Sequence, residues 1–226
     1  MQDAALIFDC DGVLVDSEPL SVAELGRTLR EAGADIGDDE IFGRMIGRDI
    51  AQILRMVREE QGVDATPLLP GYRDRLQRRF DAELRPVPGI AQAIGAMADL
   101  PRIVASSSGP ERIAHSLRLT GLADLFGDRI CSAVEVENGK PAPDLFLLAA
   151  RRLGADPARC IVIEDSEAGV RAAKAAGMRV VGFLAGSHAG VAGLAQKLPA
   201  LGPDALARRA EELPAIIGRL MANGAA

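Results

Sequence analysis

Short apolar runs alternate with amphipathic segments along most of the chain. Five runs rich in apolar and β-branched residues predict buried strands, at 4–9, 102–108, 128–136, 160–165 and 179–184. An apolar period of 3.6 residues predicts helices between them, at 88–99, 110–120, 143–153 and 166–177. Strands that alternate with helices are typical of a parallel α/β sheet.

The segment 17–84 has a different pattern. It contains no convincing strand, and its apolar spacing predicts helices at about 18–32, 38–45, 48–61 and 70–83. We therefore expect an α/β core formed by residues 1–16 and 85–226, with an all-helical domain inserted at 17–84. The tail after Gly186 is only weakly patterned.

Composition and charge narrow the class of protein. With 226 residues, 48% hydrophobic and 26% charged, the chain is typical of a globular protein with one large core or a domain plus a smaller insert. The net charge of −6 is scattered, so no charged block indicates a nucleic-acid or membrane partner. No apolar run reaches the roughly 20 residues that span a bilayer, and no signal peptide is evident. We expect a cytoplasmic monomer or weak homo-oligomer.

Polar residues follow four of the predicted strands. In open α/β sheets ligands bind beyond the carboxyl ends of the strands, so these residues are the candidates for a site. They are Asp9 and Asp11 after the first strand, Ser106, Ser107 and Ser108 after the second, Lys140 in a loop after the third, and Glu164 and Asp165 after the fourth. The sequence thus predicts one rim of acids, hydroxyls and a cation.

The acids of this rim suggest a metal site. Asp9 and Asp11 are two residues apart, so on extended chain both carboxylates lean to the same side and repel. A cation between them and the pair Glu164–Asp165 would remove that repulsion. Oxygen ligands with no His nearby favour Mg²⁺ over zinc.

Each of these motifs has a plainer interpretation when taken alone. D-x-D-G is also typical of a turn after a strand, and a strand-end Ser106 can cap backbone groups. Lys140 alone fits a solvated surface charge, and "IEDS" alone fits the N-cap of a helix. The four motifs occurring together and in order favour a functional site.

The motifs "FDCDGVLVDSE", "VASSS", "NGKPAPD" and "VIEDSEAGVRAAKAAGM" resemble the four signatures of the haloacid dehalogenase superfamily, in the right order and spacing. The resemblance covers essentially the whole chain and is to the subgroup with a helical cap inserted after the first strand. It implies a Rossmann-like parallel-sheet core with an all-helical cap domain, and a phosphatase acting on a small phosphorylated metabolite.

The resemblance also implies roles for the rim residues. Asp9 would be the nucleophile that forms an aspartyl-phosphate, and Asp11 the acid and base for the leaving group and the attacking water. Mg²⁺ would be held by Asp9, Asp165, the Asp11 carbonyl and Glu164, directly or through water. Ser106 and Lys140 would hold the transferring phosphoryl oxygens, with Ser107 and Ser108 as further substrate-binding residues.

Several residues separate the branches of the superfamily. Asp11 argues against the dehalogenases, which need no leaving-group acid, and residues 15–84 lack the Lys with which phosphonatases form a Schiff base. β-Phosphoglucomutases usually carry a His five residues after the counterpart of Asp16, where this chain has Ser21. A hydrolase is favoured, with a phosphosugar mutase as the alternative.

Two other classes of function fit the sequence less well than a phosphatase. A phosphate-sensing module that performs no catalysis would not need Asp11. A dinucleotide-binding protein would carry G-x-G-x-x-G after the first strand, and this chain does not.

The predicted cap carries the information on substrate. Arg48, at the start of a predicted helix, is either an exposed residue or a ligand for a second anionic group such as a carboxylate. The stretch "GRDIAQILRMVREEQGV" is similar to the cap of 6-phosphogluconate phosphatases. A sugar phosphate or sugar-acid phosphate is therefore the expected substrate.

Overall fold

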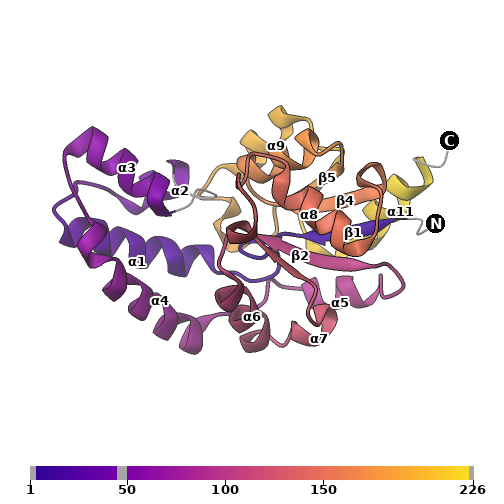
Figure 1. Cartoon of the computed structure of the whole chain (residues 1–226), viewed down its shortest axis with the longest axis horizontal. Coiled ribbons are helices and arrows are strands. Elements are labelled where there is room, and N and C mark those ends of the chain that lie inside the picture. The colour runs from indigo at the N-terminus through magenta and orange to yellow at the C-terminus, as the bar shows by residue number, and fades with distance from the viewer. Residues whose placement is uncertain (1–3, 45–49, 224–226) are drawn as a thin grey trace.

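The computed structural model describes residues 4–44 and 50–223, which form a parallel sheet, flanking helices and a helical lobe (Figure 1). The six strands lie in the order β3-β2-β1-β4-β5-β6, and every neighbouring pair is parallel. Their bounds are β1 Ala5–Phe8, β2 Arg102–Ser106, β3 Ile130–Ser132, β4 Cys160–Glu164, β5 Arg179–Phe183 and β6 Ala205–Ala207. The expected parallel α/β fold is confirmed.

Helices cover both faces of the sheet. Leu6 and Phe8 of β1 face one apolar core, whereas Ala5 and Ile7 face another, because successive side chains of a strand point to opposite faces. The first core is closed by α5 Ile90–Gly95, α6 Pro110–Leu119, α7 Ala123–Phe126 and α11 Leu213–Asn223. The second is closed by α8 Asp144–Leu153, α9 Glu167–Ala175 and α10 Leu194–Lys197. Burial on both faces explains why these strands read as continuous apolar runs.

The helical lobe consists of α1 Glu18–Glu31, α2 Asp38–Arg44, α3 Ile50–Gln61 and α4 Leu69–Glu83. It extends from one end of the sheet (Figure 1), and its described residues contain no strand. Buried residues such as Val22, Leu29 and Ile53 join its interior to the first core. These helices lie in the segment expected as a cap, although the domain boundary at 17–84 stays a prediction.

Two chain segments connect the lobe to the sheet, and they pair with each other. The Asp16 amide donates to the Arg85 carbonyl at 3.0 Å, and the Val87 amide donates to the Leu14 carbonyl at 3.0 Å. A bridge between Val15 and Pro86 lies between these bonds. The outgoing and returning chains therefore form a short antiparallel ribbon, which we call the connecting ribbon.

The structure departs from the predicted elements near two strands. The strand expected at 128–136 ends at Ser132, whose hydroxyl and backbone cap a single turn of 3-10 helix, Ala133–Glu135. The weakly patterned tail contains β6 and α11, which the sequence did not predict. β6 has only three residues, so an alternating pattern has no length in which to appear.

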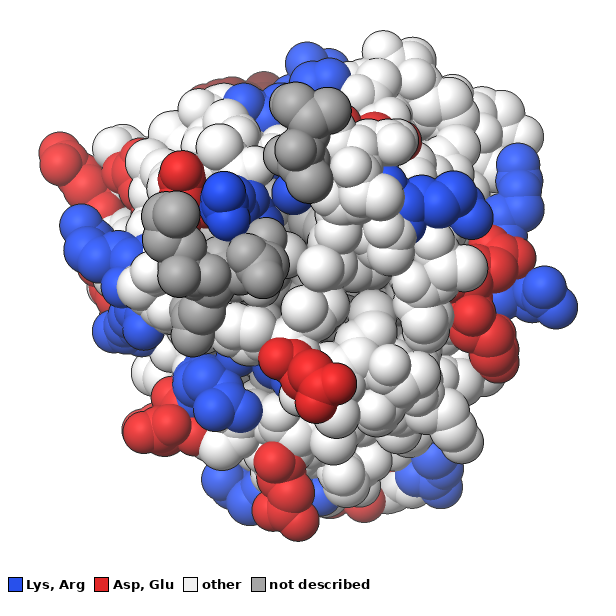
Figure 2. Space-filling model, turned by 90° about the vertical axis from the view of Figure 1, so that its right-hand side faces the viewer, with Lys and Arg blue, Asp and Glu red and all other residues white. Residues whose placement is uncertain are grey.

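The charge on the surface and the character of the helices agree with what the sequence predicts. Figure 2 shows Lys and Arg interspersed with Asp and Glu on the face in view, without a large patch of one sign. Among the helices within 4–44 and 50–223, none has the length and apolar character that crossing a membrane requires.

Candidate active site

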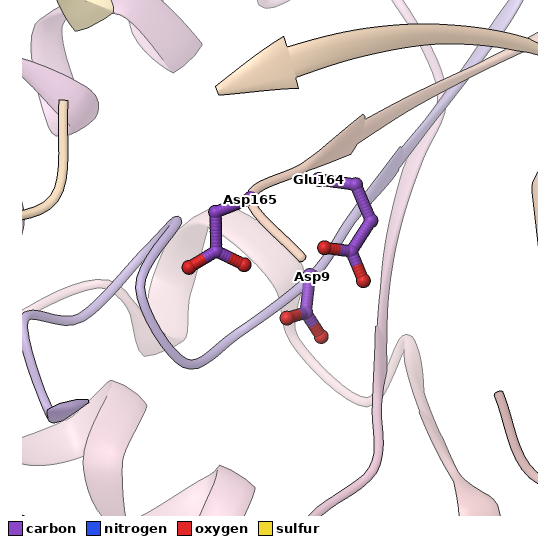
Figure 3. Close-up of side chains that lie close together, drawn as sticks. All are labelled: Asp9, Glu164 and Asp165. Carbon is purple, nitrogen blue, oxygen red and sulfur yellow. The ribbon is translucent and has the colours of Figure 1, made fainter. Parts of the chain in front are cut away.

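Three carboxylates meet beyond the ends of two adjacent strands (Figure 3). Asp9 directly follows β1, Glu164 is the last residue of β4, and Asp165 follows it. The Asp9 amide donates to the Ile163 carbonyl at 3.0 Å, which fixes the two strand ends side by side. One oxygen from each carboxylate lies within 4.8 Å of the others, so the structure brings together these three predicted ligands.

Lys140 is the cation of this cluster. Its buried Nζ donates to Asp9 Oδ1 at 2.9 Å and to Glu164 Oε1 at 2.7 Å. Burial disfavours its charge, but the two carboxylates outweigh burial and raise the pKa of Lys140 above its usual value. The Phe146 ring lies 4.9 Å from Nζ and shields the ammonium from water. Lys140 is therefore a permanently charged contact of the Asp9 carboxylate.

One lysine leaves the acidic cluster with excess negative charge. Burial, together with repulsion from neighbouring acids, raises the pKa of Asp9 and of Asp165 well above the usual value of a carboxyl group, although Lys140 acts in the opposite direction on both. Asp165 Oδ2 is buried and has no hydrogen-bond partner among the described residues. A set of hard oxygen donors with an unsatisfied buried oxygen fits a small divalent cation such as Mg²⁺.

Two glycines make room for the acids. A Cβ at Gly169 would lie 1.6 Å from Glu164 Oε1, and a Cβ at Gly12 would lie 1.9 Å from Asp165 Oδ2. Gly12 also has a φ of +78°, a conformation that side chains rarely adopt. The glycines after β1 and at the start of α9 are thus required by the packing of Asp165 and Glu164.

Glu164 is held mainly by protein groups. Besides the bond from Lys140, Oε2 accepts from the Ser166 amide at 2.8 Å and Oε1 accepts from the Ser166 hydroxyl at 3.3 Å. Both oxygens of Glu164 therefore accept hydrogen bonds, whereas Oδ2 of Asp165 accepts none from the described residues.

A histidine lies beside the acids, and the sequence analysis missed it. His188 Nε2 is 2.9 Å from Asp165 Oδ2, but the ring is not oriented to hydrogen-bond with it, and neither ring nitrogen has a partner within the described part of the chain. Burial lowers the pKa of His188, which favours the neutral ring. The expectation that no His lies near the acids is wrong. The signal was the position of "GSHAG" just beyond the carboxyl end of β5.

Asp11 lies in a different environment. Its Oδ1 accepts from Ser17 Oγ at 2.7 Å and Arg112 Nη2 at 3.0 Å, and its Oδ2 accepts from Ser108 Oγ at 2.7 Å and Ser106 Oγ at 3.4 Å. Burial disfavours the ionised carboxyl, but Arg112 and the hydroxyls outweigh burial and hold the pKa of Asp11 below its usual value. Both oxygens of Asp11 thus accept hydrogen bonds from described residues.

Arg112 was also missed by the sequence analysis. It is the third residue of α6, its side chain is 33% exposed, and it reaches from the sheet side to the lobe. Its guanidinium carbon lies 4.9 Å from the centre of the Phe80 ring, and Nη2 lies 3.4 Å from Ser21 Oγ. The helix dipole disfavours a cation in a first turn, and that local conflict was the available signal.

A cavity of about 460 Å³ separates the acids from the helical lobe. It is lined by the predicted residues Asp9, Asp11, Ser106, Ser107, Ser108, Lys140, Glu164 and Asp165. Lobe residues form the opposite wall, mainly Val22, Leu25, Ile53, Tyr72, Leu76 and Phe80. Arg48, the predicted cap ligand, lies outside the described residues.

Comparisons with known proteins agree with this site. A model of the haloacid dehalogenase-like hydrolase family matches residues 4–177. The chain is 32% identical over 186 residues to the 6-phosphogluconate phosphatase of Escherichia coli, covering 81% of this chain and 84% of that protein. It is also 32% identical over 187 residues to a phosphorylated carbohydrates phosphatase of Thermotoga maritima, covering 80% and 85%.

A solved structure extends the likeness over nearly the whole chain. A conserved haloacid dehalogenase-like protein of unknown function from Agrobacterium tumefaciens superimposes with a TM-score of 0.84 at 35% identity. The superposition covers 96% of this chain and 98% of that one. The resemblance read from the four motifs is therefore confirmed.

Proposed function

Since the chain belongs to the haloacid dehalogenase-like hydrolases, we propose that it is a Mg²⁺-dependent phosphatase that hydrolyses a small sugar phosphate or sugar-acid phosphate through an aspartyl-phosphate. The observation that carries the proposal is the cluster of Asp9, Glu164, Asp165 and Lys140 at the end of the sheet, open to a cavity of about 460 Å³.

Asp9 is the nucleophile. Its carboxylate attacks the phosphorus atom, a bond forms between the carboxylate oxygen and phosphorus, and the ester bond to the alcohol breaks. Water then attacks the phosphorus of the aspartyl-phosphate, which releases inorganic phosphate and restores the carboxylate. Lys140, 2.9 Å from Asp9 Oδ1, favours the ionised state that attack requires.

Asp11 moves the proton in both half-reactions. Protonated, it donates to the departing alkoxide, and the carboxylate that results accepts a proton from the attacking water. Ser106 and Lys140 hold the phosphoryl oxygens, and the neighbouring Ser107 and Ser108 line the same end of the cavity.

The metal residues are Asp9, Asp165, the carbonyl of Asp11 and Glu164. When bound, Mg²⁺ supplies positive charge to the transferring phosphoryl group and its anionic nucleophile. The contacts of Glu164 with Lys140 and Ser166 support a role through water, and the Asp165 oxygen that accepts no hydrogen bond from the described residues supports direct ligation. We further propose that 17–84 acts as a cap over the core formed by 1–16 and 85–226.

Hydrolysis of p-nitrophenyl phosphate with Mg²⁺ and with EDTA tests the proposal. We expect turnover that depends on Mg²⁺, and no turnover with the metal present would overturn it. The alternative, a phosphosugar mutase, is tested with β-glucose 1-phosphate. A mutase gives glucose 6-phosphate, whereas a phosphatase gives glucose and inorganic phosphate. Ser21, in place of the mutase His, favours the phosphatase.

A further inference from the structure

We propose that Arg112 determines the substrate class: it binds a second anionic group, a carboxylate or a phosphate, carried by the leaving alcohol. The inference rests on the proposed function and deepens it. It begins with the ion pair between Arg112 Nη2 and Asp11 Oδ1 at 3.0 Å on the cavity wall.

The guanidinium of Arg112 has donors to spare. Nη2 contacts both Asp11 and Ser21, whereas the buried Nε has no hydrogen-bond partner within the described part of the chain. A third of the side chain remains exposed, and the residue lines the cavity. The planar fork of arginine matches carboxylate and phosphate oxygens two at a time. Arg112 thus presents its charge to the cavity, and its Nε is a buried donor without a partner among the described residues.

The other cations that line the cavity are less suited to this role. Among the described lining residues they are Lys140 and Arg73. Lys140 already donates to Asp9 and Glu164, and the proposed reaction assigns it to the transferring phosphoryl group. Arg73 is exposed to solvent, where screening weakens an ion pair. Arg112 is the partly buried cation beside the position of the leaving oxygen.

The surroundings favour an anion at Arg112. The Phe80 ring packs on the guanidinium and keeps water from one of its faces, which strengthens charge pairing there. Glu18 shares the cavity, but burial, and then repulsion by Asp11 and Asp165, raises the pKa of its carboxyl to about 8. A raised pKa reduces the negative charge that Glu18 carries near neutral pH.

An anionic leaving group can pair with the Arg112 guanidinium, whereas a neutral leaving group cannot. We therefore expect the discrimination between the two to appear in kcat/KM.

Pairs of substrates that differ only in one anionic group measure how much that group contributes to kcat/KM. Sorbitol 6-phosphate and 6-phosphogluconate differ by CH₂OH against carboxylate at the far end, and glycerol 3-phosphate and 3-phosphoglycerate differ in the same way on a shorter chain. Fructose 1-phosphate and fructose 1,6-bisphosphate test a second phosphate. For wild type we expect kcat/KM for the anionic member of at least one pair to be higher by roughly 10- to 100-fold, the range of a hydrogen bond to a charged group.

Arg112→Gln should bring that ratio close to one, whereas Arg73→Gln, which removes the exposed cation of the same cavity, should keep it. Arg112→Lys keeps the charge and should recover part of the preference, and melting temperatures check folding. Equal losses for both members of a pair in Arg112→Gln, or no anionic preference in wild type, would overturn the inference. If wild type still hydrolyses p-nitrophenyl phosphate in a Mg²⁺-dependent manner, the inference about Arg112 has failed while the proposed phosphatase function stands.

Discussion

Asp9 and Asp11 are two residues apart in the sequence, yet they belong to different halves of the site. Asp9 follows β1, is contacted by Lys140, and lies beside Glu164 and Asp165 at the end of β4. Asp11 is bound by Ser17, Ser108 and Arg112. Burial raises the pKa of the first carboxyl, whereas Arg112 and the hydroxyls outweigh burial and lower the pKa of the second.

In the proposed mechanism, this difference lets one short loop support two tasks. The Asp9 half is built from buried groups fixed by neighbouring strands, which suits a metal and a nucleophile that must keep their positions. The Asp11 half uses hydroxyls and an arginine that also contacts Ser21 and Phe80 of the helical lobe. This half therefore links residues on the sheet side of the cavity to residues of the lobe.

The Asp9 half is tested most severely by Asp9→Asn. An amide cannot form the acyl-phosphate, so we expect turnover of p-nitrophenyl phosphate to fall by at least about a thousandfold. The near-isosteric side chain should leave the circular dichroism spectrum unchanged. Activity above about one per cent of wild type, without deamidation, would contradict the role of nucleophile.

Asp11→Asn tests the other half. Loss of a general acid typically costs about 10²- to 10⁴-fold, so hydrolysis of an alkyl phosphate should slow by that much. The p-nitrophenolate group needs little protonation, and single-turnover formation of the aspartyl-phosphate from p-nitrophenyl phosphate should slow less. Equal losses in that step for both substrates would count against the acid role.

Lys140→Met probes the charge balance of the Asp9 half. Removing one partner of a buried charged cluster typically lowers the free energy of unfolding by about 3–5 kcal/mol. Urea unfolding at pH 7 in EDTA measures this loss. Arg27→Met is the matched control, because it breaks an exposed Arg27–Glu31 pair and should change stability by under about 1 kcal/mol. Similar losses in the two variants would show that Lys140 is not a buried counter-charge.

The two neighbouring acids should differ in their effect on metal binding. Asp165→Ala removes an oxygen that accepts no hydrogen bond from the described residues, whereas Glu164 is already held by Lys140 and Ser166. We expect Mg²⁺ affinity in calorimetric titrations to fall by roughly tenfold or more in Asp165→Ala, and less in Glu164→Ala. Unchanged affinity in Asp165→Ala would show that the ion binds elsewhere.

The smallest expected effect is on the pH dependence of stability. The folded-state pKa of Asp11 lies below its unfolded value, so the folded protein binds fewer protons there. Its contribution to stability is present above the unfolded pKa, near 3.9, and is lost as the pH falls through the folded pKa. Acid unfolding of wild type and Asp11→Asn should therefore converge at low pH. A stability difference that grows as the pH falls would contradict the lowered pKa.

The sequence predicted the Asp9 half better than the Asp11 half. Asp9, Glu164 and Asp165 follow adjacent strands, and the order of a parallel sheet brings such ends together. Arg112 and His188 reach the site through helix placement and loop packing, which no local period encodes. β6 is too short to show a pattern, and it is stabilised by pairing with β5 instead.

The connecting ribbon determines how the lobe is joined to the sheet. Because Asp16 pairs with Arg85 and Val87 pairs with Leu14, the two crossings form one hydrogen-bonded ribbon and not two independent linkers. A change in the angle between the lobe and the sheet would therefore have to bend both crossings together, and it would change the distance between Phe80 and Arg112, which come from opposite sides of this joint.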